Sequence, residues 1–524
     1  MSNFENAKVL VKQGWLQGYI DGNLKIFKGV PYAAPPVGEL RWRHPQDPEN
    51  WRGVRRAVEY SAAAIQHVRE QPNMPANVHG VPQNLARSQY EEDCLYLNIW
   101  TPAKAETDKL PVFVWIHGGG MVAGSGVECV CDGDGFAKRK DIVVVTINYR
   151  LGFYGFFAHP ELTAEGNGTS GNYAFYDMRK ACLWLKENIA QFGGDPDNIT
   201  VAGQSGGAAA TGSLHVSPMM KGIIKRVSIE SGPIYWGFQQ PVHREILEER
   251  GVEFMKSVGC KNIAELRQRD AWELFDAYEQ QGREFGFSMC IDGEFIPAPY
   301  KEMMDAGNFN DFDVLMGSCS QEFASAPNGI SVADYYKYLE ESFPDNAENM
   351  KKWYPAATDD EAAKQATTIS SDIMLMGAVR IGQLCNQYGR KAYIWRMVKE
   401  TEDERGRKAG SPHCAEMVYV FGRVDKGGRS PFSDYHWVGA DYDFMEEIQN
   451  YWYNFALTGD PNSAATPEWK PYTEDFAINE LGNDTHMITD PEMQAKYAYY
   501  FKKLMALPGE APVSVQMRGL AKLL

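Results

Sequence analysis

Cysteine motifs, excess positive charge and long apolar runs are all missing from this sequence. Its nine cysteines are scattered through 524 residues without any CxxC pair, which argues against a disulfide framework or a thiolate metal site. Acidic residues outnumber Lys and Arg by 69 to 52, giving a net charge of −17 at pH 7, and this disfavours binding to nucleic acid or an anionic membrane. No segment approaches the roughly 20 apolar residues of a membrane span, and residues 1–6 begin no secretory signal. We therefore expect a cytoplasmic protein that contacts neither nucleic acid nor membrane.

The composition is that of a folded globular chain with a sizeable core. Hydrophobic residues make up 44% of the sequence, aromatic residues 12% and charged residues 23%, which is ordinary for a soluble protein. Cys129 and Cys131 lie close together in a loop rich in Gly and Asp, and we expect them to be unpaired thiols. No repeat or domain linker stands out, and the sequence leaves monomer and homodimer open.

Short apolar strands alternate with helical segments through the centre of the chain. The helix expected over 175–192 has apolar Met178, Cys182, Leu185 and Ile189 at three- to four-residue spacing. The strands expected are Leu95–Trp100, Val112–Ile116, Ile142–Ile147, Ile199–Ala202, Val227–Ile229, Val314–Met316 and Ala392–Arg396. This alternation predicts an α/β protein with a central, mostly parallel sheet and helices on both faces.

Three other stretches complete the outline of the fold. Alternating segments near Val9–Leu16 and Leu24–Phe27 predict an N-terminal antiparallel meander. Residues 66–91 are rich in Pro, Asn and Gln and predict a long surface loop. Aromatic residues at helical spacing over 441–458 predict a helix whose aromatic face belongs to the core.

Ser205 is the candidate nucleophile. The apolar run Ile199–Ala202 ends in Gly203-Gln204-Ser205-Gly206-Gly207, and small residues of helical character follow. In a sharp turn from strand to helix, the residues two before and two after the serine crowd each other, so both are glycine and the hydroxyl is exposed. The pattern predicts a nucleophile at the end of a sheet strand.

Backbone donors for an oxyanion are expected in two places. The strand Val112–Ile116 leads into His117-Gly118-Gly119-Gly120, and loop amides at this position serve acyl transfer in such sheets. We expect the N–H groups of Gly119, Gly120 and Gly206 to act as donors. The spacing from Gly118 to Ala123 also fits a dinucleotide-binding motif, but a helix would have to begin there, and the next residues form loops instead.

A serine nucleophile needs a base and a carboxylate that orients it. In this type of sheet the acid precedes the histidine in the chain, which leaves His413, His436 and His486. His413 lies in a polar turn, where catalytic residues are common. Glu322 follows the strand Val314–Met316, where a parallel sheet presents ligand-facing groups.

Several long motifs, in order along nearly the whole chain, resemble the type-B carboxylesterase family, the cholinesterase-like branch of the α/β-hydrolases. Residues 192–207 resemble the serine signature of that family, and residues 92–100 its second signature. Further similar segments are 27–33, 148–152, 291–297 and 452–462.

The resemblance implies an α/β-hydrolase fold over 1–524, in which loop 66–91 and a helical insertion around 324–390 flank an active-site gorge. It also implies a triad of Ser205, Glu322 and His413 that hydrolyses neutral, fairly apolar carboxylic esters without a metal or cofactor. The same triad could act mainly on amides, thioesters or lactones. A non-catalytic binding relative is disfavoured, because all three triad residues are present.

Some residues fit the family pattern and others depart from it. Arg150 with Asp177, and Arg41 with Glu92, resemble its buried ion pairs. Gln204 and Gly206 stand where the family usually has Glu and Ala, and Met121 replaces a usual aromatic residue. No cysteine precedes Cys94, so the disulfide that secreted relatives form there is excluded. For the substrate pocket we expect the following residues: Met121, Trp236, Phe285 and Phe287.

Overall fold

The computed structural model describes residues 3–67, 87–235, 239–282, 286–322, 329–402, 408–424, 437–473 and 476–506. Trp236, Phe285, His436 and most of loop 66–91 lie outside these ranges.

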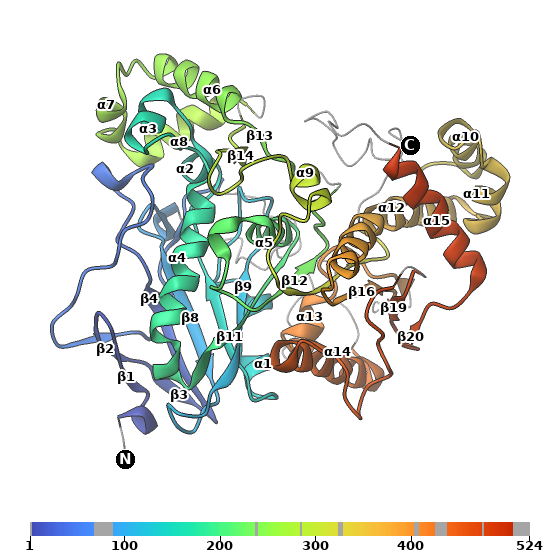
Figure 1. Ribbon diagram of the computed structural model, residues 1–524, viewed down its shortest axis with the longest axis horizontal. Coiled ribbons are helices and arrows are strands. Elements are labelled where there is room, and N and C mark those ends of the chain that lie inside the picture. The colour runs from blue at the N-terminus through green and yellow to red at the C-terminus, as the bar shows by residue number, and fades with distance from the viewer. Residues whose placement is uncertain are drawn as a thin grey trace.

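A large mixed sheet forms the centre of the molecule (Figure 1). Within the described ranges it has eleven strands. Their order across the sheet is β20 (His486–Met487), β19 (Ile478–Leu481), β16 (Ala392–Met397), β15 (Asp313–Cys319), β12 (Arg226–Glu230), β11 (Gly194–Gln204), β9 (Leu110–Ile116), β10 (Val143–Ile147), β8 (Tyr96–Thr101), β4 (Leu24–Pro31) and β3 (Tyr19–Asp21). The run from β19 to β10 is parallel throughout, and the remaining pairings are antiparallel. The mostly parallel sheet predicted from the apolar strands is confirmed.

Strand β11 begins earlier than its apolar run indicates. The sequence places a strand at 199–202, whereas β11 starts at Gly194 and pairs with β9 on both sides of an irregularity between Gly194 and Ile199. Residues 195–198 therefore belong to a bulged strand, although their local composition predicts a loop.

The predicted N-terminal meander is divided between two sheets. The hairpin of β1 (Lys8–Val11) and β2 (Gly14–Gln17) pairs with β5 (Val54–Arg56) in a small sheet of its own. The next hairpin, β3 and β4, joins the edge of the large sheet through β8. Three two-strand ladders accompany these sheets, namely β6 (Ala63–Ala64) with β7 (Tyr90–Glu91), β13 (Val242–His243) with β14 (Cys290–Ile291), and β17 (Thr401–Glu402) with β18 (Lys408–Ala409).

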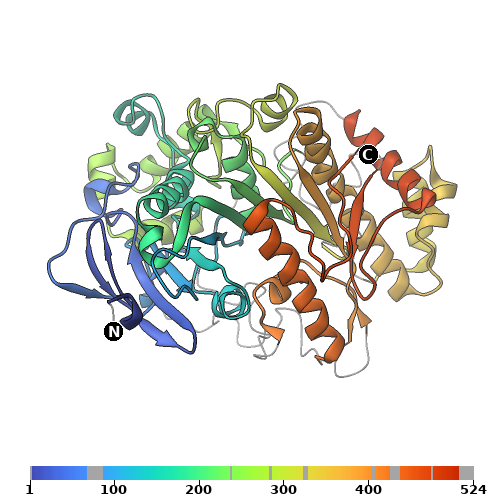
Figure 2. The same cartoon turned by 60° about the horizontal axis from the view of Figure 1, so that its bottom comes forward.

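Helices cover both faces of the sheet (Figure 2). Alternate residues of β9 enter two different cores: Val112 and Val114 join the cluster that includes the helices α4, α5 and α12, while Phe113 and Trp115 join the cluster with α1, α13 and α14. This period of two is what a strand covered on both faces requires. These helices are α1 (Asp134–Ala137), α4 (Tyr173–Asn188), α5 (Gly206–Val216), α12 (Asp359–Gln387), α13 (Met417–Val420) and α14 (Gly439–Thr458).

The remaining helices lie at the two ends of the sheet (Figure 1). On the N-terminal side these are α2 (Gly152–Phe156), α3 (Pro160–Glu165), α6 (Arg244–Ser257), α7 (Ile263–Arg267) and α8 (Ala271–Gln280). Near the C-terminal strands lie α10 (Val332–Ser342), α11 (Ala347–Trp353) and α15 (Pro491–Met505), and α9 (Tyr300–Asp305) lies between the groups. The segment expected to be helical around 324–390 contains α10, α11 and α12. In the described parts of the chain, no helix is long and apolar enough to cross a membrane.

Both expected ion pairs are present and buried. The guanidinium of Arg150 donates to Asp177 from Nε over 2.8 Å and from a terminal nitrogen over 2.7 Å. Arg41 makes the same two-pronged contact with Glu92 at 2.6 Å on each side. Removing one partner of such a pair leaves a buried charge and costs about 3–5 kcal/mol. The pairs therefore stabilise the fold. Cys94 is a free, buried thiol.

Candidate active site

Ser205 occupies a strained turn between β11 and α5. Its φ of 57° and ψ of −122° lie outside the regions that most residues adopt. A Cβ on Gly203 would lie 2.4 Å from the carbonyl oxygen of Gly207, and one on Gly207 would lie 2.1 Å from that of Ile116. The glycines on both sides of the serine are therefore required by packing, as the sequence pattern predicts.

The loop after β9 packs directly against this turn. Gly119, Gly120 and Met121 all have positive φ, of 96°, 65° and 60°. A Cβ on Gly206 would lie 2.6 Å from the nitrogen of Gly120, so the backbones of the two predicted donor segments are in contact. No helix begins at this loop, since the next α-helix, α1, starts at Asp134. The dinucleotide-binding interpretation therefore lacks the helix that it needs.

Glu322 and His413 are brought together from two different loops. Glu322 follows β15, and the backbone N–H of Cys319 donates to its Oε1 over 2.6 Å. Its other oxygen, Oε2, accepts a hydrogen bond from His413 Nδ1. The two loops are themselves joined, because the N–H of Gln321 donates to the carbonyl of Ser411 over 2.9 Å. Both side chains are buried, with residue exposures of 6%.

Gln204 links the histidine to the nucleophile turn. Its side-chain amide nitrogen lies 3.1 Å from His413 Nε2 and 3.3 Å from Nδ1. Because Nδ1–H faces Glu322, Nε2 is the ring nitrogen that acts as an acceptor, and the Gln204 amide lies at hydrogen-bond distance from it. Gln204 immediately precedes Ser205 at the end of β11, so the imidazole contacts the residue next to the candidate nucleophile.

The surroundings of His413 make its imidazole a stronger base. Burial lowers the pKa of the imidazole, but interactions with its neighbours raise it by more, so the pKa lies above its ordinary value. Burial also raises the pKa of the Cys414 thiol, which is therefore neutral at pH 7. The negative charge that stabilises the imidazolium is thus that of Glu322.

The other candidates are placed as follows. His486 lies on β20, exposed, with Nδ1 bonded to the carbonyl of Asp484 at 2.8 Å, far along the sheet from β11. Met121 is 3% exposed and Phe287 is 2% exposed. Phe287 packs in an aromatic cluster with Phe157 and Tyr278. The pocket residues remain predictions.

Two buried carboxylic acids beside this site carry no sequence signal of their own. Glu416, three residues after His413, accepts a hydrogen bond from the Cys319 thiol at 3.1 Å. Glu230 accepts from Trp452 Nε1 at 2.8 Å. Burial raises the pKa of each to about 8, helped for Glu416 by the charge of Glu322 and for Glu230 by that of Glu416. The one sequence signal that could have identified Glu416 is its position three residues after His413, and Glu230 has no such signal. Among the described residues, no group of three His, Cys, Asp or Glu side chains could hold a metal ion.

Comparisons with known proteins agree with this architecture. Residues 5–499 match the model of the Carboxylesterase family. The chain is 31% identical to fumonisin B1 esterase of Sphingopyxis macrogoltabida over 487 residues, covering 90% of this chain and 86% of that protein. It is also 31% identical to phenmedipham hydrolase of Pseudarthrobacter oxydans, covering 90% and 94% of the two chains.

Solved structures of the same class are similar over almost their full length. The carboxylesterase EST55 of Geobacillus stearothermophilus superposes with a TM-score of 0.75 at 28% identity, covering 94% of this chain and all of that one. A PNB esterase gives a TM-score of 0.76 at 27% identity, covering 95% and 99%. The fold is thus the α/β-hydrolase fold, and the chain belongs to the carboxylesterase family. It is a carboxylic ester hydrolase.

Proposed function

We propose that this enzyme hydrolyses neutral, fairly apolar carboxylic esters through an acyl-enzyme on Ser205, with His413 as base and Glu322 as the acid that orients it. The observation that carries the proposal is the buried hydrogen bond between Glu322 and His413, next to the strained serine turn. The strain at Ser205 holds its hydroxyl at the end of β11, where the histidine can take its proton.

The reaction follows from these positions. Ser205 Oγ attacks the ester carbonyl carbon while His413 Nε2 takes the hydroxyl proton, and the negative oxygen faces the N–H groups of Gly119, Gly120 and Gly206. The C–O bond to the alcohol breaks as His413 returns the proton to the leaving oxygen. Water, deprotonated by the same histidine, then attacks the acyl carbon and releases the acid. Glu322 holds Nδ1–H and stabilises the imidazolium in both steps.

An apolar substrate is supported by the residues beside the serine turn. Met121, which follows the glycine loop, is buried and apolar, and a methionine provides a soft and adaptable wall. A charged acyl group would lose its hydration against this apolar side chain, which is costly. The charge of −17 on the chain also disfavours anionic esters at long range.

Replacing the nucleophile tests the proposal. Ser205→Ala should lower kcat for p-nitrophenyl esters of short acids by at least about 10³-fold, because no acyl-enzyme can form. It should also abolish covalent labelling by a fluorophosphonate, measured as the mass shift of the intact protein.

Ser370→Ala is the matched control, since Ser370 is buried on α12 and its hydroxyl has no hydrogen-bond partner among the described residues. Retained turnover in Ser205→Ala would refute the assignment, and rates on a matched ester and amide would show which bond the triad prefers.

A further inference from the structure

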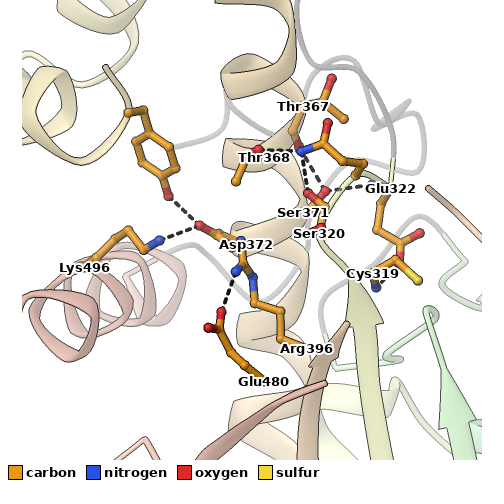
Figure 3. A network of polar contacts seen from close by, with 12 residues as sticks. Cys319, Ser320, Glu322, Thr367, Thr368, Ser371, Asp372, Arg396, Glu480 and Lys496 are labelled. Carbon is orange, nitrogen blue, oxygen red and sulfur yellow. Dashed lines mark hydrogen bonds and ion pairs between the residues drawn. The ribbon is translucent and has the colours of Figure 1, made fainter. Parts of the chain in front are cut away.

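The turn that carries the triad acid is held from outside by a helix. Glu322 lies three residues beyond the end of β15, so the strand ladder does not reach it. Its backbone N–H donates to the hydroxyl of Ser371, on α12, over 2.8 Å. Figure 3 shows Ser371 directed at Glu322 from the side of the helix.

The hydroxyl of Ser371 is arranged to accept this bond. It donates its own proton to the carbonyl of Thr367, one helical turn earlier, over 2.9 Å. A helical serine that bonds back in this way keeps its lone pairs for another donor. Ser371 is 1% exposed, so no bulk water can replace it, and without it the N–H of Glu322 would be a buried donor with no partner.

A second contact fixes the residue before the acid. The side-chain amide of Gln321 donates to Thr368 Oγ1 over 2.6 Å, and Thr368 lies one turn of α12 before Ser371. The backbone N–H of Gln321 reaches Ser411, two residues before His413. Helix α12 therefore contacts the acid turn directly, and that turn contacts the loop of the base.

Helix α12 is itself fixed at the level of Ser371. The next residue, Asp372, is fully buried and forms ion pairs with Arg396 of β16 at 3.0 Å and Lys496 of α15 at 2.8 Å. The hydroxyl of Tyr354 donates to the same carboxylate over 2.7 Å. In Figure 3 Asp372 and Ser371 leave the helix toward different neighbours, the ion cluster and the acid turn. This cluster therefore sets the position from which Ser371 acts.

We propose that Ser371 is a positioning residue for ester hydrolysis, and that with Thr368 it holds the turn Ser320–Glu322 so that the carboxylate meets His413. The inference rests on the proposed triad. Ser371 contacts neither substrate nor the reacting atoms; it acts through the backbone of Glu322. Its loss lets the carboxylate move away from the imidazole, which weakens the base without changing the substrate pocket.

The experiment compares Ser371→Ala with Ser370→Ala, its buried neighbour on the same helix. We expect Ser371→Ala to lower kcat on the order of 10-fold with KM changed less than about 2-fold, because only the orientation of the base is affected. The acid limb of the kcat/KM profile should move to lower pH, since a displaced carboxylate stabilises the imidazolium less. Ser371→Thr, which keeps the hydroxyl, should restore most of kcat.

Loss of folding alone gives a different result. It lowers the active fraction, as titrated with a fluorophosphonate, but leaves the pH limb of the remaining enzyme in place. Thr368→Ala, on the half-buried side of α12, should move kcat and the limb in the same directions by smaller amounts, so it serves if Ser371→Ala does not fold. If Ser371→Ala and Thr368→Ala both had the kcat of the control Ser370→Ala, or both kept its acid limb, the inference would be overturned.

A readout without turnover separates this inference from the proposed function. In the Ser205→Ala background, the downfield proton resonance of the bond between His413 and Glu322 should weaken or shift when Ser371→Ala is added. An unchanged resonance overturns the role of Ser371 whatever the enzyme hydrolyses. Failure of the proposed function would instead appear as turnover that survives Ser205→Ala.

Discussion

At the residue scale, Gly206 determines how closely the glycine loop after β9 approaches the turn of Ser205. The structure gives this glycine a packing role, because a Cβ would lie 2.6 Å from Gly120 N and 2.8 Å from Met121 N. Gly206→Ala should push this loop away and lower kcat on the order of 10²-fold, the usual effect of losing one oxyanion donor. Steady-state kinetics on a p-nitrophenyl ester measures the change.

Gly439→Ala is the control for this substitution. Gly439 begins α14, and nothing lies within 4 Å of the Cβ that an alanine would add, so activity should remain unchanged. Equal kcat values for Gly206→Ala and wild type would mean that the loop adjusts freely, and the close contact would then have no catalytic importance.

Residues near the reacting atoms were the most predictable part of the site. The glycines around Ser205 follow from sterics that any such turn must obey, so the pattern implies them. The contact between Gln204 and His413 could not be predicted, because it joins residues 209 positions apart. Cys414, Glu416 and Glu230 were missed for the same reason: their roles depend on burial and on neighbours from other elements, and no local spacing encodes these.

At the element scale, α12 connects the stability of the molecule to the geometry of its site. Asp372→Asn removes the charge between Arg396 and Lys496, so Lys496 loses the carboxylate it pairs with and Arg396 keeps only its ion pair with Glu480. The free energy of unfolding should fall by about 3–5 kcal/mol. Urea unfolding followed by circular dichroism measures this loss. The pKa of Asp372 lies below its ordinary value, because the charges of Arg396 and Lys496 outweigh burial, so its contribution is lost as pH falls.

A surface ion pair provides the comparison for Asp372. Lys337 and Glu341 of α10 pair one helical turn apart, with side chains 70% and 68% exposed, and Glu341→Gln should change stability by less than about 0.5 kcal/mol. If Asp372→Asn lost no more than Glu341→Gln, the buried cluster would not be what holds α12.

Helices and strands were predictable to different degrees. Strands β9 and β10 were located to within about two residues, since strands covered on both faces are apolar throughout. Strands β11 and β15 extend beyond the apolar runs that predicted them. Helix α12 was expected only as part of a helical segment. Its polar residues Ser371 and Asp372 are typical of a solvated face, yet both are buried, and only the tertiary pairing of α12 with β15, β16 and α15 explains them.

At the scale of the whole molecule, this acidic chain buries the carboxylic acids Glu230 and Glu416 in their neutral form. Glu230 and Glu416 are fully buried, with pKa values raised to about 8, chiefly by burial. Each is protonated at neutral pH in the folded state but ionised in the unfolded chain. Folding therefore takes up protons at these positions, and the free energy of unfolding must fall as pH rises between the two pKa values.

Glu416→Gln isolates this effect, because the amide keeps an oxygen for the Cys319 thiol but cannot ionise. Above its unfolded pKa near 4.5 and up to about 8, wild type loses up to about 1.4 kcal/mol per pH unit at this residue, and the variant loses none. The variant should therefore match wild type at pH 4.5, gain relative stability as pH rises, and keep a constant advantage above pH 8. Urea unfolding of both proteins across this range, with Glu341→Gln as the exposed control, measures the difference. A stability difference that did not vary with pH would mean that Glu416 is already ionised in the folded enzyme.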